Sequence, residues 1–173
     1  AGAPGTYSAS TSLDTPESVE LSLSHKLSGK TSIHAASTWT RWSRFQDLTV
    51  ASSGPGPLAN TVELFHWKDS MAYAVGVTHQ HCDKLLLRAG LAYDNSPVSP
   101  AERSVRLPSG DRRVASIGAG YNLSPTQTID ASYTYVDEET AEVRRPAGGG
   151  FPGYNADFHN RAIVYGLQFT QKF

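Results

Sequence analysis

The chain has 173 residues, of which 39% are hydrophobic and 18% charged, and its formal net charge is −1. This length is enough for one ordinary domain with a sizeable core. The near-neutral charge gives no support for a nucleic-acid partner. The single cysteine excludes an internal disulfide framework. No stretch approaches the roughly 18 consecutive apolar residues of a membrane-spanning helix.

Seven segments alternate apolar and polar residues, which is the period of a β-strand. In the first, Val19, Leu21 and Leu23 alternate with Glu20 and Ser22. No segment has the pattern of a helix, so the chain is predicted to be all-β. The predicted strands lie at about 17–27, 31–44, 65–81, 85–93, 113–123, 129–136 and 161–173.

The connections between these strands alternate in length. Short links at 27–30, 81–84 and 123–128 alternate with long polar loops at about 44–64, 95–111 and 137–160. Tight turns on one side and long loops on the other are typical of an antiparallel outer-membrane β-barrel. A soluble sandwich or barrel has no physical reason to gather its long loops at one end.

Aromatic residues on the apolar faces indicate which face meets lipid. A membrane barrel turns its apolar face outward and places aromatic rings at both lipid–water boundaries. Aromatic plugs in the mouth of a soluble barrel would explain only one such cluster. The candidates near the long loops are Trp39, Trp67, Tyr93 and Tyr135, and those near the opposite ends are Tyr121 and Phe173.

The last strand ends in phenylalanine. Tyr165, Leu167 and Phe169 alternate toward Phe173, although Gln171 interrupts the pattern. Such an end resembles the signal by which bacterial outer-membrane barrels are recognised for insertion, so we expect the barrel-assembly machinery as a partner.

Several short motifs resemble the C-terminal half of the FadL/TodX family, the long-chain fatty-acid transporters of Gram-negative outer membranes. The more specific block is Ala-Tyr-Asp-Asn-Ser-Pro-Val at 92–98, followed by Arg-Ser-Val at 103–105 and Leu-Pro-Ser-Gly-Asp-Arg at 107–112. Modest matches are Pro-Glu-Ser at 16–18, Trp-Ser-Arg-Phe at 42–45 and Trp-Lys-Asp at 67–69. These matches occur in the same order as in the family and cover about residues 15–173.

The resemblance implies a fourteen-stranded monomeric barrel that is plugged by an N-terminal hatch. It implies passive transport of long-chain fatty acids or other hydrophobic small molecules, with no enzymatic activity and no cofactor. Residues 1–173 match only the last seven strands, and residues 1–12 carry no export signal. We therefore expect a fragment: the C-terminal part of a single transmembrane barrel domain, without the hatch, in contact with outer-membrane lipid and lipopolysaccharide.

Lys68 is the first candidate ligand-binding residue. Its parity places it on the polar, lumen-facing side of the third predicted strand, beside Trp67. The resemblance implies that a lysine in this context helps to hold the head group of the ligand. An ammonium can fix a carboxylate by a charge-assisted hydrogen bond, worth roughly 1.5–3 kcal/mol. The alternative is an ion pair between Lys68 and a lumen acid such as Glu20 or Asp130.

Arg88, also lumen-facing by parity, is the second candidate ligand-binding residue. It could contact a carboxylate of the cargo, but an arginine in this setting more often pairs with an acid across the barrel. Three further arginines, Arg103, Arg112 and Arg113, flank the loop before the fifth predicted strand. We expect these three to face solvent or lipopolysaccharide and not the ligand.

Other chemistry is disfavoured by the sequence. His79 and His81 share one face beside Cys82 but have no further clustered ligands for a metal. The acids at 137–139 fall in a charged loop. An outer-membrane lipid hydrolase would need a Ser/His pair facing lipid, whereas His34 and His66 face inward by parity. A soluble lipid-binding β-barrel, with Leu23, Val75 and Leu87 buried, is the remaining alternative.

Overall fold

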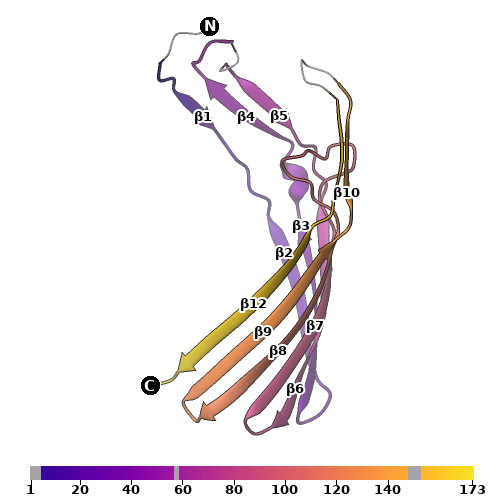
Figure 1. Ribbon diagram of the computed structural model, residues 1–173. Helices are drawn as coiled ribbons and strands as arrows, with labels where there is room; N and C mark the ends of the chain where they lie inside the picture. Colours follow the sequence, from indigo (N-terminus) through magenta and orange to yellow (C-terminus); the bar gives the residue numbers. More distant parts are fainter. Residues whose placement is uncertain (1–4, 57–58, 148–152) are drawn as a thin grey trace.

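The computed structural model describes residues 5–56, 59–147 and 153–173. Seven antiparallel strands form one curved sheet in the order β12-β9-β8-β7-β6-β3-β2 (Figure 1). This confirms the seven predicted strands. They are β2 (Ser18–Lys26), β3 (Thr31–Thr40), β6 (Ser70–Cys82), β7 (Leu85–Asp94), β8 (Arg112–Ser124), β9 (Gln127–Glu138) and β12 (Arg161–Gln171).

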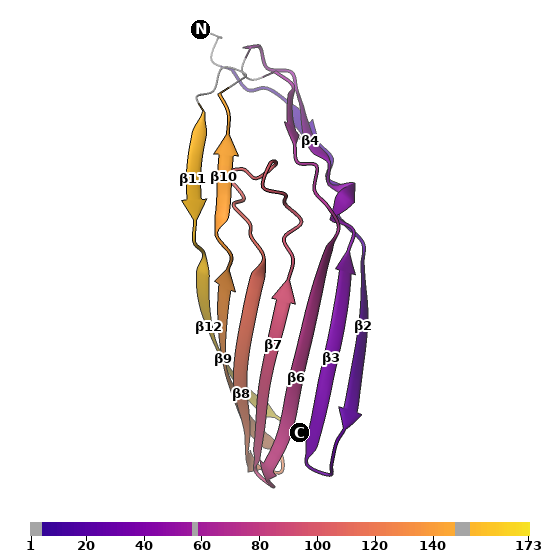
Figure 2. The ribbon, with the colours of Figure 1, turned by 90° about the vertical axis from the view of Figure 1, so that its right-hand side faces the viewer.

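The tight turns lie at one end of the sheet and the long connections at the other. Figures 1 and 2 show the links β2–β3, β6–β7 and β8–β9 together at the lower end, with the longer segments rising from the upper end. This is the asymmetry predicted from the connection lengths. Among the described residues, no helix is long and apolar enough to cross a membrane.

Two of the long connections contain strands that the sequence analysis treated as loop. In the first, β4 (Asp47–Ser52) pairs with β5 (Thr61–Leu64), and β1 (Ala9–Thr11), which precedes β2, adds a third strand beside β4. In the last, β10 (Ala141–Arg145) and β11 (Tyr154–Phe158) form a hairpin. Figure 2 shows both extending beyond the main sheet at its long-loop end. Residues 57–58 and 148–152 of these predicted loops lie outside the described part of the chain.

The ends of two predicted strands were wrong. The second strand stops at Thr40, and Trp42–Arg44 forms a short 3-10 turn. The third begins only at Ser70, because the backbone N–H groups of Phe65 and His66 donate to the carbonyl of Gln46 and not to the sheet. His66 also has a φ of 45°, a left-handed backbone conformation that a regular β-strand does not contain.

The register separates two faces, as the alternation predicted. One face, which we call the apolar face, carries residues such as Leu21, Val75, Leu91, Ile117 and Leu167. Leu21 is 77% exposed and Leu167 is 82% exposed. The buried apolar residues of the described chain are Val98, Ala141 and Val143, and all three lie outside the main sheet. Among residues 5–56, 59–147 and 153–173, none therefore covers the apolar face, which leaves it free for contact with lipid.

The opposite face, which we call the polar face, is built from small and polar residues. Its members include Ser24, His34, Gly76, Arg88 and Ser132. In an outer-membrane barrel, residues that alternate with the lipid-facing ones line the interior. The polar face is therefore the candidate lumen wall.

Candidate functional site at the base of the long loops

Lys68 lies in the segment before β6, so its predicted place within the third strand was wrong. Its backbone N–H donates to the carbonyl of Pro97 at 2.9 Å, which joins this segment to the β7–β8 connection. Its side chain is exposed and makes no ion pair within the described residues. The alternative pairing with Glu20 or Asp130 is not formed, because Glu20 accepts from Thr38 and Asp130 pairs with Arg88.

A cavity of about 350 Å³ lies beside Lys68, and we call it the loop cavity. Its lining combines Lys68 with Pro97, Val98 and Arg103 of the β7–β8 connection and Glu139 after β9. Three segments that are distant in sequence therefore meet here. The sequence analysis placed Arg103 toward solvent or lipopolysaccharide; the structure places it in the wall of this cavity.

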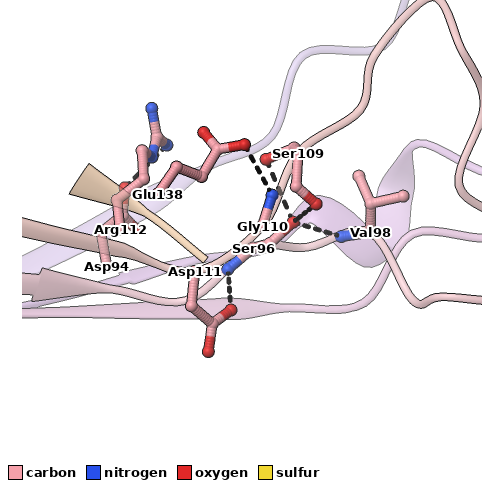
Figure 3. Close-up of polar contacts among 8 residues, drawn as sticks. All are labelled: Asp94, Ser96, Val98, Ser109, Gly110, Asp111, Arg112 and Glu138. Carbon is pink, nitrogen blue, oxygen red and sulfur yellow. Dashed lines mark hydrogen bonds and ion pairs between the residues drawn. The ribbon is translucent and has the colours of Figure 1, made fainter. Parts of the chain in front are cut away.

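Asp111 joins the two stems of the β7–β8 connection. Its carboxylate accepts from the hydroxyl of Tyr93, from the backbone N–H of Ser96 at 2.8 Å and from the side-chain amide of Asn95 at 3.1 Å. Figure 3 shows the Asp111–Ser96 contact. Burial alone raises the pKa of this carboxyl, but the hydrogen bonds from Tyr93, Ser96 and Asn95 outweigh it, so that the pKa is lowered.

Further polar contacts fix the other side of the same connection (Figure 3). Glu138 accepts from the backbone N–H of Gly110 and from the amide of Asn160, both at 2.9 Å. Arg112 donates to Asp94 at 2.7 Å. Arg112 therefore joins β7 to β8 through an ion pair.

Gly110 is required by close packing at this point. A Cβ on Gly110 would clash with the backbone carbonyl oxygen of Glu139. Backbone cannot yield as the end of a flexible side chain can, so a larger residue would have to displace the segment after β9. The Pro-Ser-Gly-Asp-Arg stretch at 108–112 thus has a structural reason for its glycine.

Arg88 lies on the polar face of β7 and pairs with Asp130 of β9 at 2.9 Å. This is the pairing with an acid that the sequence analysis preferred. The pair passes over β8 at Gly120, where a Cβ would lie 2.6 Å from the Asp130 carboxylate oxygen. Gly120 therefore makes room for the ion pair, and a groove of about 670 Å³ on the polar face contains both partners.

One row of the polar face, two residues in from the charged row of Asp94, Arg112 and Glu138, carries alanine or valine on six of its seven strands, with Ser22 on β2. We call it the apolar belt. It runs across six adjacent strands through Ala36, Ala74, Ala92, Val114, Val136 and Ala162. The next row is polar or small on β3 to β9, with His34, Gly76, Gly90, Ser116 and Thr134, and ends with Val164 on β12.

Four aromatic rings gather at the base of the β4–β5 hairpin. Trp67 packs against Trp42, Phe45 and Phe65 with ring centroids 4.8–5.5 Å apart. Trp67 therefore packs within the cluster of aromatic rings in this connection. The prediction that it lies on a strand face in the aromatic girdle was wrong. Trp39 remains on the strand and donates its indole N–H to Asp69 at 3.2 Å.

The histidines give no catalytic or metal-binding arrangement. His34 lies on the polar face, where its ring nitrogens meet the hydroxyls of Ser24 at 2.8 Å and Thr78 at 3.1 Å. A hydrolytic Ser/His pair needs a carboxylate or similar group to orient the histidine, and here a threonine takes that position. His66, expected on a strand, precedes β6 and lies 3.5 Å from Glu102. Within residues 5–56, 59–147 and 153–173, no group of three potential ligands could hold a metal.

Comparison with known proteins assigns the chain to a family. The family model described as outer membrane protein transport protein (OMPP1/FadL/TodX) matches residues 1–173. The chain belongs to this family. Its place is accordingly the outer membrane of a Gram-negative bacterium, which confirms the predicted family and localisation.

Individual relatives agree with this assignment. A Pseudomonas aeruginosa FadL homologue of known structure is 32% identical, with a TM-score of 0.81, over 94% of this chain and 37% of that one. An outer membrane protein of Neisseria meningitidis is 32% identical over 92% of this chain and 36% of its own length. The long-chain fatty acid transport protein of Escherichia coli O6:H1 is 29% identical over 97% of this chain. The chain spans 36–37% of these relatives.

Proposed function

We propose that the protein takes part in passive transport of long-chain fatty acids or other hydrophobic small molecules across the outer membrane, and that Lys68 holds the anionic end of the cargo. The observation that carries this proposal is the position of Lys68: a cation without a counter-ion among the described residues, lining a cavity where three connections meet. The family assignment and the name of the Escherichia coli relative support the cargo class.

The two faces of the sheet support transport over catalysis. The apolar face is exposed for contact with lipid, and the polar face carries the apolar belt next to the charged row. A hydrocarbon chain can lie against alanine and valine while its head group stays among the charged residues toward the loops. This part of the protein would then supply part of the barrel wall, the outer connections and part of the binding pocket.

The partners follow from the same arrangement. We propose outer-membrane lipid and lipopolysaccharide around the apolar face, the barrel-assembly machinery acting through the C-terminal strand β12, and a monomeric barrel in the complete protein. Arg88 would act on the cargo only indirectly, because Asp130 already occupies its guanidinium.

The test is fatty-acid binding and uptake by the full-length protein. Cells that lack their own fatty-acid transporter should take up labelled oleate when they produce it, and Lys68→Ala should weaken oleate binding roughly ten-fold or more. Uptake equal to that of cells without the protein would refute transport of this cargo. Normal uptake with unchanged affinity of the Lys68→Ala variant would instead refute only the head-group role.

A further inference from the structure

Three charged residues lie on the apolar face at its long-loop end, and we call them the outward ion-pair row. The register places Arg113 of β8 beside Asp137 of β9, and Asp137 beside Arg161 of β12. Figure 2 shows these three strands next to one another at one edge of the sheet. The side chains of Arg113 and Arg161 are 66% and 73% exposed. Because long loops mark the outer side of a membrane barrel, this row lies at the boundary of the outer leaflet.

Both arginines keep N–H donors that no group of the described chain uses. Arg161 donates from Nε to Asp137 at 3.1 Å, and Arg113 donates from Nη2 to Glu139. Neither guanidinium makes another hydrogen bond within the described residues. Two arginines and two acids sum to no net charge, so an anion would be held by the remaining N–H groups and not by a positive field. A phosphate suits them, because a guanidinium can donate two parallel hydrogen bonds to it.

An apolar groove of about 670 Å³ adjoins the outward ion-pair row, and we call it the lipid groove. It crosses β2, β3, β6, β7, β8 and β9 and is lined mainly by residues of the apolar face. Two of its lining residues, Ala115 and Tyr135, lie two positions before the row, at Arg113 and Asp137, on the same strands. The hydroxyl of Tyr135 also donates to Asp137 at 3.4 Å. Groove and row are therefore continuous.

The lipid groove is inclined along the sheet. Ala35 lines it as the fifth residue of β3 counted from the short link, whereas Tyr135 is the ninth residue of β9 counted in the same way. A strand advances about 3.3 Å per residue, so the groove lies roughly 13 Å farther from the short link on β9 than on β3. An acyl chain in the groove would thus have its head group at the outward ion-pair row.

We infer that the lipid groove and the outward ion-pair row together bind lipid A, the phosphorylated and acylated anchor of lipopolysaccharide. One acyl chain lies in the groove, and Arg113 and Arg161 donate to a phosphate on the sugar head group. This inference rests on the proposed contact between the apolar face and outer-membrane lipid, and it names the residues that recognise that lipid. A phospholipid of the opposite leaflet fits less well, because its head group would lie at the short links.

The experiment measures lipid binding to the purified full-length protein by native mass spectrometry. The probes are lipid A with two phosphates and the same lipid with both phosphates removed. Arg113→Gln combined with Arg161→Gln is expected to weaken binding of the phosphorylated lipid about ten-fold and to leave binding of the other unchanged. The matched control is Arg145→Gln, because Arg145 is an exposed arginine on β10, outside the groove lining and the row.

A second pair of variants tests the lipid groove. Ala115→Trp would fill its long-loop end and should weaken binding of both lipids several-fold. Ala119→Trp is the control, because Ala119 lies on the same face of β8 but outside the lining. Mobility of unheated and heated samples in detergent gels, which differs for folded and unfolded barrels, should be the same for every variant.

Four results would overturn the inference. They are unchanged lipid A affinity of the double arginine variant, an equal loss for both lipids in that variant, an equal loss in Ala119→Trp and Ala115→Trp, and tighter binding of phosphatidylglycerol than of lipid A. Oleate binding by the same preparations keeps the proposed function separate. Retained oleate binding beside any of these results rejects the lipid A site alone, whereas lipid A binding without oleate binding rejects only the proposed cargo.

Discussion

Arg88 and Asp130 form an ion pair that passes over an intervening strand, with 2.9 Å between Nη1 and Oδ1. The pair is possible because β8 presents Gly120 at the crossing point. It links β7 to β9 through side chains across β8, in addition to the backbone ladders that join the three strands.

We expect a modest coupling between these two charges. Their side chains are 46% and 27% exposed, so the coupling free energy in a double-mutant cycle of Arg88→Ala and Asp130→Ala should be about 0.5–1 kcal/mol. The measurement is denaturant unfolding of the full-length protein in lipid vesicles. Gly120→Ala should abolish most of the coupling, because its methyl group would displace the carboxylate. Strictly additive single mutants would contradict the pairing.

Narrowing the apolar belt should slow transport. Ala92→Phe on β7 adds a ring to the polar face at the belt, so uptake of labelled oleate by the full-length protein should fall several-fold. The matched control is Ala89→Phe on the same strand, since Ala89 pairs with Val77 and Ile117 on the apolar face. Its ring would point toward lipid and should leave uptake nearly unchanged. Equal effects of the two variants would argue against cargo contact with the belt.

Gly110→Ala should destabilise the base of the long loops. The added methyl group would clash with the carbonyl of Glu139, and overpacking of this kind typically costs about 1–3 kcal/mol. Thermal unfolding and protease sensitivity of the 95–111 connection would report the change. Gly29→Ala serves as the control because nothing lies within 4 Å of its added Cβ. If the two variants behaved alike, the close packing at Gly110 would be refuted.

The outer end of β2 should resist mild acid. Hydrogen bonds from Arg44, from the backbone and from Arg41 lower the pKa of Glu17 from 4.5 to about 2. A carboxyl with a lowered pKa stabilises the fold above its unfolded pKa, and this contribution is lost as pH falls from about 4.5 toward 2. A carbon-13 NMR titration of Glu17 should therefore show no protonation at pH 4. In a variant with Arg41→Gln and Arg44→Gln the midpoint should move up toward 4.5; an unchanged midpoint would rule out the two arginines as the cause.

Spin labels can test which face meets lipid. Labels at Leu21, Val75 and Leu167 in the full-length protein should be accessible to oxygen, which dissolves in acyl chains, and protected from a water-soluble nickel reagent. A label at Ser132 on the polar face provides the contrast and should be more accessible to the nickel reagent. Aqueous or protein-packed signals from the three apolar sites would reverse the assignment of the two faces.

The wall was predictable from sequence because the alternation has a period of two and acts residue by residue. The register shifts beside two of the short links, between Gln80 and Cys82 and between Asn122 and Ser124, but the alternation within each strand persists. The predicted face of β7 is therefore confirmed: it carries Leu85, Leu87, Ala89, Leu91 and Tyr93. The ends of strands were less predictable. The end of β3 at Thr40 did have a signal, because Arg41 falls on the apolar parity of Ile33 and Trp39 and so breaks the alternation there.

The strands within the long loops had a signal that was not used. The segment Asp47–Ser52 alternates Leu48 and Val50 with polar residues, which is the same pattern in a shorter run. Flanking proline and glycine made the region resemble an unstructured loop. Such short strands are stable here because they pair with each other beyond the main sheet.

The candidate site could be predicted only in part. Lys68 was identified from its motif but was wrongly placed on a strand, because alternation holds only within a continuous strand and the positive φ of His66 shows that the strand has not yet begun there. Arg103 could not be found this way. Its position depends on how the β7–β8 connection folds back on Lys68 and Glu139, and no local pattern encodes such a return.

The hydrogen bonds of the Asp111 carboxylate affect what protease cleavage of the β7–β8 connection would do to the structure. Because it ties Ser96 at the start of the β7–β8 connection to its own end, the stems are joined independently of the residues between them. Arg106, whose side chain is 74% exposed, offers a trypsin-like enzyme an accessible bond. A cut there would loosen the tip of the connection, while the two stems, and the wall they rise from, would stay fastened together.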